Sequence, residues 1–486
     1  MDPVAFEAYL EDDSRVGEPL PGSARGTAGG AACGDLIAIA LRLEGECVAG
    51  VRIEASGCGA ARATAAAAAE LLDGHRPRGG SCSTPRPSPP SSAASHPVGA
   101  HAHDLAAEAA HRALGAAVAG TDEPILAPPA EGERVLVAVS GGVDSAVAAL
   151  LEREGGAEVI AVTLELWSDP ANDGEQSCCS ADAVRTARAV AQAQGIPHLT
   201  VDLRDRFRAG VVEPFLEGYA DGVTPNPCVR CNGRVRIAPM IAIAERLGAA
   251  GLATGHYARI RDDGDGPLLS AAADEAKDQA YMLAGLPTAA LAKLRFPLGG
   301  LTKPEVRAIA ARAGLAVADK AESQDLCFLA GVGKAGFLAA HGDLADREGD
   351  IVDASGAVVG RHPGHHRFTV GQRRGLGIAA PEPLYVTATD AVTNRVVVGP
   401  ASDLDTRTVR VRDAVLHRPA ARVGAVKIRY RSQPVGCHVN GGGEAAGSGA
   451  HEALELELDE AARAAAPGQT AVLFDGDLVV GHGTIA

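Results

Sequence analysis

A short string of serine, glycine and aspartate, Ser140-Gly141-Gly142-Val143-Asp144-Ser145, has the composition of an anion-binding turn. It follows the apolar run RVLVAV and precedes the helical pattern AVAALLERE. Glycines let backbone N–H groups approach an anion, a helix N-terminus adds partial positive charge, and serine hydroxyls donate hydrogen bonds. The GK[ST] ending of a Walker P-loop is absent. We predict a phosphate-binding turn; the alternative is an ordinary strand–helix turn with Asp144 as a capping carboxylate.

Two cysteine-containing strings form a second centre of possible chemistry. They are TPNPCVRCN, with Cys228 and Cys231, and ESQDLCF, with Cys327. A thiolate is a good nucleophile and a carrier of persulfide sulfur, and two facing cysteines can close a disulfide and expel sulfide. The strings therefore predict thiol chemistry. The vicinal pair Cys178-Cys179 lies in a polar loop and is interpreted as incidental.

Length, charge and composition limit the class of protein. A chain of 486 residues predicts two to four domains, and 46% hydrophobic with 22% charged residues is typical of globular proteins. A net charge of −16 argues against a generally basic, nucleic-acid-coating protein but allows a local basic surface. No apolar run is long enough to span a bilayer, and the N-terminus has no basic leader. We expect a cytoplasmic protein whose 10 cysteines are reduced.

The elements that would position these residues divide the chain into parts. Residues 36–56 predict two strands joined at Gly45, and helices are expected at 60–74 and 103–119. From residue 133, strands alternate with helices, which predicts an α/β, doubly wound parallel sheet. Short strands with frequent glycines follow residue 345 and predict small sheets or a barrel. We expect an α+β front domain at 1–120 with a Pro/Ser-rich loop at 76–100, a linker at 121–132, the α/β domain at 133–340, a β-rich central domain at 341–400 and a C-terminal β-barrel at 401–486.

The SGGVDS string resembles the pyrophosphate loop of the N-type ATP pyrophosphatases, which implies ATP and Mg²⁺, with release of AMP and pyrophosphate. Over residues 133–486 the chain resembles the tRNA-specific 2-thiouridylases. The resemblance rests on separate strings in order: SGGVDS, TPNPCVRCN, ATGHYAR, KDQAYML, SQDLCF, FTVGQRRGLGI, KIRYR and PGQTAVLF.

This resemblance implies roles for individual residues. Cys231 matches the nucleophile, Cys327 the cysteine that bears the persulfide, and Asp144 the residue that assists the metal–pyrophosphate. The implied ATP contacts are Ala138, Val139, Ser140, Gly141, Gly142, Val143, Asp144, Ser145, Leu164 and Gly255. The implied tRNA contacts are Asn226, Pro227, Cys228, His256, Lys277, Asp278, Gln279, Arg429, Tyr430 and Gln469. The basic strings QRRGLG and KIRYR, with His365, His366 and Arg367, are expected to hold the tRNA backbone.

Cys228 departs from the family pattern, which often has an aspartate acid/base helper there. Three thiolates, Cys228, Cys231 and Cys327, would suit a [4Fe–4S] cluster with one open iron. A reduced, metal-free C-x-x-C pair is the alternative.

The front domain resembles the NifU/IscU-like scaffolds on which iron–sulfur clusters are assembled. Cys33, Asp35 and Cys58 match the ligand and helper positions, and His103 stands in the frame of the third cysteine. Because imidazole ligates zinc and iron, the implied site is zinc or an iron–sulfur cluster in altered form. A degenerate domain kept for docking or folding is the alternative.

The expected function is ATP-dependent 2-thiolation of uridine 34 of tRNA, by adenylation of the C2 oxygen and sulfur transfer from Cys327. The resemblance implies tRNAs for Lys, Glu and Gln, and a cysteine desulfurase or sulfur carrier as donor, with neither DNA nor membrane as a partner. The alternatives are a cluster scaffold or trafficking protein with a vestigial pyrophosphatase half, and an amidating pyrophosphatase-type synthetase.

Overall fold

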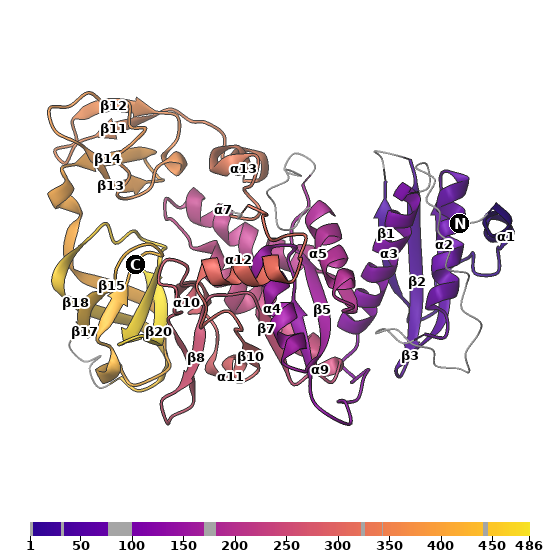
Figure 1. Cartoon of the computed structure of the whole chain (residues 1–486). Coiled ribbons are helices and arrows are strands. Elements are labelled where there is room, and N and C mark those ends of the chain that lie inside the picture. Colours follow the sequence, from indigo (N-terminus) through magenta and orange to yellow (C-terminus); the bar gives the residue numbers. More distant parts are fainter. Residues whose placement is uncertain are drawn as a thin grey trace.

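The computed structural model describes residues 3–30, 34–75, 100–169, 181–321, 326–342, 344–440 and 446–486. From the N-terminal end, the chain forms a small α+β part, a parallel-sheet part, a β-rich part and a barrel (Figure 1). Within the described residues, no helix is long and apolar enough to cross a membrane.

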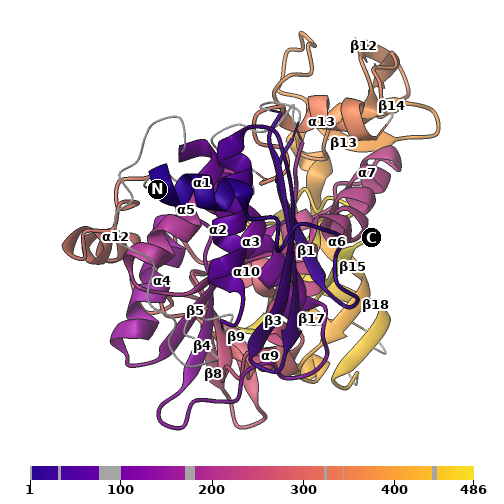
Figure 2. The ribbon, with the colours of Figure 1, turned by 90° about the vertical axis from the view of Figure 1, so that its right-hand side faces the viewer.

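The front part is an antiparallel sheet of order β1-β2-β3 covered by helices. The predicted strand pair is confirmed as β2 and β3, which turn at Gly45. Figure 2 shows the helices lying against this sheet. Its elements are α1 (Pro3–Glu11), β1 (Ala24–Gly29), β2 (Leu36–Glu44), β3 (Cys47–Ser56), α2 (Gly59–Leu72) and α3 (Ala100–Ala119).

The predicted doubly wound parallel sheet is confirmed, with strand order β10-β7-β4-β5-β6. The chain passes from β4 outward to β5 and β6, and then returns to the other side of β4 to form β7. Such a reversal leaves a crevice at the carboxyl ends of the two central strands. The strands are β4 (Arg134–Ala138), β5 (Glu158–Glu165), β6 (His198–Asp202), β7 (Gly251–Thr254) and β10 (Leu294–Arg295).

Helices and two π-helical turns surround this sheet. The helices are α4 (Val143–Glu154), α5 (Ala181–Ala193), α6 (Arg204–Phe207), α7 (Glu213–Ala220), α8 (Pro227–Arg230), α9 (Ile237–Arg246), α10 (Ala280–Leu283), α11 (Thr288–Leu291), α12 (Lys303–Arg312) and α13 (Gly333–His341). The π-helical turns are Arg208–Val212 and Cys231–Arg236.

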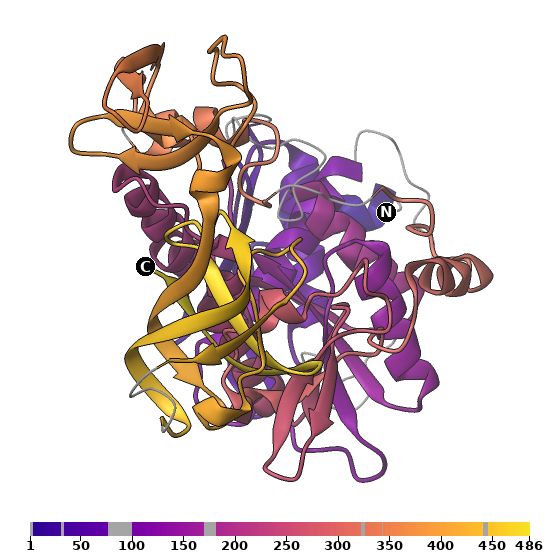
Figure 3. The same ribbon diagram turned by 90° about the vertical axis from the view of Figure 1, so that its left-hand side faces the viewer.

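The expected β-rich end is a four-stranded sheet followed by a closed barrel (Figure 3). The sheet has the order β12-β11-β14-β13 and consists of β11 (Gly349–Val352), β12 (Val358–His362), β13 (Tyr385–Asp390) and β14 (Arg395–Gly399). The barrel closes through the pairing of β15 with β20. Its strands are β15 (Asp405–Leu416), β16 (Ala425–Lys427), β17 (Val435–Val439), β18 (Gly449–Arg463), β19 (Thr470–Asp475) and β20 (Leu478–Ile485).

A hairpin from the α/β part extends the barrel sheet, which sequence patterns did not indicate. β9 (Pro267–Ser270) pairs with β20, and β8 (Arg259–Asp262) pairs with β9. Arg418 of the barrel donates to the Asp263 carboxylate of the hairpin loop, at 2.6 and 3.1 Å. The barrel is thereby fixed to the α/β part by strand pairing and by an ion pair.

Helix α3 joins the front part to the parallel sheet. It packs on β1 and β2 and also on the edge strand β6. The packing is close, because a Cβ atom on Gly115 would stand 1.8 Å from the Thr200 carbonyl oxygen. Arg112 of the same helix donates to the buried Glu165 carboxylate at the end of β5, at 2.5 and 2.9 Å. The front part is therefore bound directly to the sheet that carries the SGGVDS loop.

Replacing Arg112 with Ala should lower the free energy of unfolding by about 3 kcal/mol, because a buried carboxylate loses its guanidinium partner. Glu165 is 5% exposed, and Arg112 also contacts the buried Glu108 at 2.7 Å. The measurement is urea denaturation of the full chain. Arg25→Ala breaks the exposed pair with Glu54 and should cost less than about 1 kcal/mol. Equal losses in the two variants would contradict the role given to Arg112.

Candidate functional site

The SGGVDS string forms the turn between β4 and α4. Ser145 Oγ accepts a hydrogen bond from the Ser140 backbone N–H at 3.1 Å and donates to the Gly142 carbonyl oxygen at 3.1 Å. Gly141 has a φ of +70°, and a Cβ atom there would lie 2.8 Å from the Ala183 carbonyl oxygen, so the position needs glycine. Helix α4 has no side-chain cap at its N-terminus. The turn thus leaves an uncapped helix N-terminus beside a pocket, as anion binding requires.

Two pockets meet at this turn. The larger has a volume of about 600 Å³ and the smaller about 230 Å³, and both are lined by Ser140, Asp144, Ser145 and Gln279. Of the residues predicted to bind ATP, Ala138, Val139, Leu164 and Gly255 line the smaller pocket, and Gly142 and Val143 line the larger. Gly141 lies within the turn. The structure therefore brings the predicted ATP residues together around one branched space.

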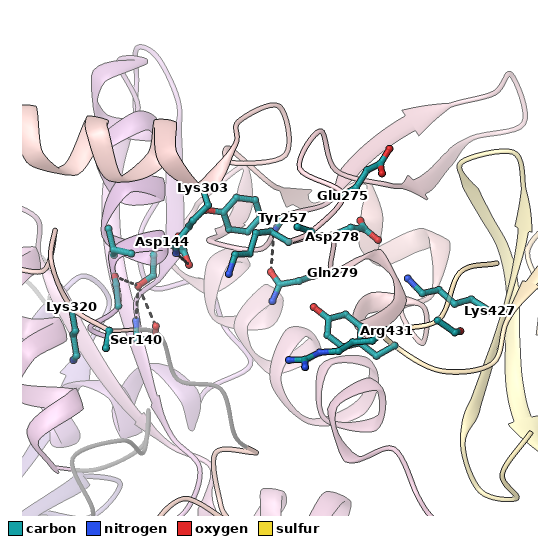
Figure 4. Close-up of a pocket in the computed structure, with 18 of the residues that line it drawn as sticks. Ser140, Asp144, Tyr257, Glu275, Asp278, Gln279, Lys303, Lys320, Lys427 and Arg431 are labelled. Carbon is teal, nitrogen blue, oxygen red and sulfur yellow. Dashed lines mark hydrogen bonds and ion pairs between the residues drawn. The ribbon is translucent and has the colours of Figure 1, made fainter. Parts of the chain in front are cut away.

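Three cationic side chains at these pockets were missed by sequence reasoning. Arg236 lines the smaller pocket, and Lys303 and Lys320 line the larger. Lys303 donates to both carboxylate oxygens of Asp144, at 2.7 and 2.8 Å, and Lys320 donates to the Gly141 carbonyl oxygen at 3.0 Å. Figure 4 shows Lys303 and Asp144 pointing toward one another. The one signal in the sequence was the Thr302-Lys303-Pro304-Glu305 helix start, which does not reveal where the lysine points.

His256, predicted to contact tRNA, lines the smaller pocket beside Gly255. Its Nδ1 lies 2.7 Å from Thr254 Oγ1. Burial lowers the pKa of His256 to about 3, and the positive charge of Arg236 acts in the same direction. The ring is therefore neutral at pH 7.

Two cysteines, one from each string, meet at one hydrophobic core: Cys231 belongs to it and Cys327 packs against it. Cys231 begins the π-helical turn after α8 and is 8% exposed, whereas Cys228 and Cys327 are half-buried. Phe328 is fully buried, and its ring centroid lies 5.1 Å from that of Phe215 and 5.1 Å from that of Phe337. This packing anchors the chain next to Cys327. Residues 322–325 of the second string lie outside the described residues.

The described residues form no three-thiolate site. Among the described residues, which include Cys228, Cys231 and Cys327, no group of three or more His, Cys, Asp and Glu side chains is placed to hold a metal ion. The expectation that every cysteine is reduced is also wrong, because Cys47 takes part in a disulfide. The pair Cys178-Cys179 lies outside the described residues.

The residues predicted to contact tRNA fall in several places. Lys277, Asp278, Gln279 and Tyr430 line the larger pocket, together with Lys427 and Arg431 of the basic string KIRYR. Asn226 and Pro227 line a third pocket of about 530 Å³. Arg429 donates to the Val370 carbonyl oxygen at 3.0 Å, and Gln469 donates to the Thr224 carbonyl oxygen at 2.8 Å. The last two side chains thus tie chain segments together.

Two histidines expected to hold the tRNA backbone belong to the core instead. His365 and His366 are 8% and 4% exposed, and burial lowers the pKa of His366. His365 Nδ1 lies 3.2 Å from the Asn394 side-chain oxygen. The sequence expectation was wrong for this pair, because a run of basic residues in the chain does not show which of them a turn buries.

Part of the predicted scaffold site is present in the front domain. Asp35 accepts from the Cys58 backbone N–H at 2.7 Å and from its thiol at 3.2 Å, and these bonds lower the pKa of Asp35. His103 is exposed, and the histidine whose charge acts on Asp35 is His101. Cys33 lies outside the described residues.

The fold and the pockets define an α/β nucleotide-binding protein with an appended barrel and a scaffold-like front domain. Family models match each part: a NifU-like N terminal domain at residues 10–116, a tRNA methyl transferase HUP domain at 133–331, a tRNA methyl transferase PRC-barrel domain at 336–400, and an aminomethyltransferase beta-barrel domain at 407–485.

Relatives match the whole chain or its enzyme half. The bifunctional protein NifU/MnmA of Rubrobacter xylanophilus is 42% identical over 490 residues, covering 98% of this chain and 97% of the relative. The tRNA-specific 2-thiouridylases MnmA of Geobacter metallireducens and Mycolicibacterium vanbaalenii are 43% and 44% identical, each over 73% of this chain and 96% and 99% of the relative. The chain belongs to the family of bifunctional NifU/MnmA proteins.

The low pKa of His256 should make the protein less stable in acid. Its pKa in the folded state, about 3, lies below the ordinary 6.5, so between these values the unfolded chain binds a proton that the folded chain excludes. The free energy of unfolding should fall with decreasing pH by about 1.4 kcal/mol per unit from this residue. Denaturation between pH 4 and 6.5 should therefore show a shallower slope in His256→Asn than in the wild type. Substitution of the exposed His438 is the control, and equal slopes in the wild type and His256→Asn would contradict the assignment.

Proposed function

We propose that this chain is an ATP-dependent tRNA-uridine 2-sulfurtransferase that thiolates wobble uridine 34. One observation carries the proposal: the residues that directly follow Cys231 pack against the chain that leaves Gln279 in the wall of both pockets. Gln279 lines both pockets, and the chain that follows it packs on the cysteine segment. Asn232 Nδ2 donates to the Met282 carbonyl oxygen at 3.1 Å, and a Cβ atom on Gly233 would lie 2.7 Å from the Gly285 carbonyl oxygen. Activation by ATP and sulfur transfer can therefore act on one substrate.

Activation comes first in this scheme. The uridine C2 oxygen attacks the α-phosphorus of ATP, the bond to the bridging oxygen breaks, and pyrophosphate leaves. The Cys231 thiolate then attacks the Sγ of persulfidated Cys327, forming a disulfide and expelling hydrosulfide. Hydrosulfide adds to C2, and the C2–O bond breaks as AMP departs with that oxygen. An external thiol reduces the disulfide.

A basic wall of the larger pocket supports tRNA as the substrate. Lys277, Lys427 and Arg431 line it from the α/β part and the barrel, in a protein whose net charge is −16. Phosphate contacts need a few well-placed cations and not a basic protein. We further propose tRNAs for Lys, Glu and Gln as substrates, a cysteine desulfurase or sulfur carrier as the donor, and the cytoplasm as the site of action.

The described residues fit a magnesium ion but not an iron–sulfur cluster. Asp144 offers carboxylate oxygens to Mg²⁺ at the larger pocket, and the ion would supply charge neutralisation for the phosphates. A [4Fe–4S] cluster at Cys228, Cys231 and Cys327 does not fit the described residues, because they gather no such ligand group.

A second function, as a cluster or zinc scaffold, is favoured for the front domain by the contact of Asp35 with the Cys58 thiol.

We propose that the chain divides into domains and a linker at residues 1–120, 121–132, 133–340, 341–400 and 401–486. The four sheets support it, since each lies in one of the front, α/β, central and barrel parts, apart from the β8–β9 hairpin of the α/β part, which joins the barrel sheet.

Cys231→Ser and Cys327→Ser should each reduce thiolation roughly a thousandfold or more, because each removes a sulfur atom that the scheme requires. Mass analysis of nucleosides from tRNA incubated with ATP and a sulfur donor measures this. Cys437→Ala is the control, since that thiol lies buried in the barrel. Thiolation near the wild-type rate in either serine variant would remove that cysteine from the chemistry.

Removal of iron from the full chain should leave thiolation unchanged when a cysteine desulfurase supplies the persulfide sulfur, because no described group of side chains holds a metal at the cysteines. The experiment compares iron content with thiolation rate before and after chelation. Loss of activity that iron restores would show that a cluster forms at Cys228, Cys231 and Cys327.

A further inference from the structure

Two lysines that are distant in the sequence reach the SGGVDS loop. Lys303 is the first residue of α12, and Thr302 and Glu305 form a capping box that fixes this end of the helix. The Lys303 backbone N–H also donates to Asp274 at 2.9 Å. These contacts hold the helix start so that the Lys303 side chain extends to Asp144 on the loop.

The Lys303 ammonium is buried in an ion pair. The residue is 7% exposed, its Nζ lies 2.7 and 2.8 Å from the Asp144 carboxylate oxygens, and the Tyr257 hydroxyl donates to the same carboxylate at 2.9 Å. A buried ammonium requires an anion beside it. Asp144 meets that requirement in this structure, and Lys303 nevertheless faces the larger pocket.

Lys320 has a different partner. Its Nζ donates to the Gly141 carbonyl oxygen at 3.0 Å, and it lines the same pocket. A carbonyl oxygen carries no net charge, so this contact orients the ammonium without neutralising it. The pocket therefore has an excess of positive charge at the glycine turn, beside the α4 N-terminus.

We propose that Lys303 and Lys320 bind the β- and γ-phosphates of ATP and hold pyrophosphate as it leaves. The inference rests on the proposed function. When the bond between the α-phosphorus and the bridging oxygen breaks, negative charge grows on that oxygen, and ammonium groups stabilise it by charge-assisted hydrogen bonds without proton transfer. The flexible stem and three N–H donors of Lys303 let it contact Asp144 and a phosphate together, or leave Asp144 for the phosphate.

The two pockets predict which part of the nucleotide depends on these lysines. Leu164, Gly255 and His256 line only the smaller pocket, whereas Lys303 and Lys320 line only the larger. With the loop between them, adenosine occupies the smaller pocket and the phosphates extend into the larger. Loss of a lysine should weaken ATP and pyrophosphate binding and leave AMP binding nearly unchanged.

Isothermal titration of the full chain with ATP, AMP and inorganic pyrophosphate tests this. Lys303→Met and Lys320→Met should each weaken ATP and pyrophosphate binding by about tenfold or more, and AMP binding by less than about threefold. Lys303→Arg should restore much of the binding. Lys293→Met is the matched control, because that lysine pairs with Glu245 and lines neither pocket.

A second variant covers the case in which Lys303→Met unfolds because Asp144 loses its partner. The double variant Lys303→Met/Asp144→Asn removes both charges, and in titrations without Mg²⁺ it should bind ATP and pyrophosphate, but not AMP, more weakly than Asp144→Asn alone. Equal weakening for AMP and ATP would mean that the lysines are structural, and unchanged binding of all three ligands would also overturn the inference. If the wild type binds none of them, the proposed function itself fails.

Discussion

The chain reverses its direction of winding between β4 and β7, and the rest of the site depends on that reversal. Because these adjacent strands are parallel, their carboxyl ends lie side by side, and the loops that follow them must approach closely. A Cβ atom on Gly255, after β7, would stand 2.7 Å from the Ser145 backbone nitrogen, after β4. Two strings more than a hundred residues apart thereby form one nucleotide pocket.

Charge at the site is supplied by segments that lie far from the glycine turn in sequence. Lys303 and Lys320 come from the region after β10, and Lys427 and Arg431 come from the barrel. The overall charge of −16 hides this arrangement, since it sums over the whole surface. The barrel reaches the pocket because the β8–β9 hairpin and the Arg418–Asp263 ion pair fix it to the α/β part.

Local patterns predicted the fold and singled out residues that line the two pockets, for a physical reason. A buried parallel strand must be apolar, and a glycine turn with serine hydroxyls has few uses besides anion binding, so Val135–Ser145 identified both sheet and site. Lys303 and Lys320 were not predicted because a single lysine has no local sequence signature. Their positions at the loop depend on tertiary contacts with Asp144 and Gly141. His365 and His366 were predicted to be exposed from their polar type alone, but the fold buries them. The packing of α3 on β6 could not be predicted either, because the sequence of an alanine-rich helix does not indicate which strand it packs on.

The transfer of one oxygen atom tests the central claim most directly. If ATP activates the uridine and a cysteine-derived sulfur displaces the activated group, the C2 oxygen must leave with AMP. The measurement is a reaction on tRNA carrying ¹⁸O at C2 of uridine 34, with mass analysis of the AMP released. AMP should then gain one ¹⁸O atom for each thiouridine formed. Thiouridine formation with unlabelled AMP would contradict it.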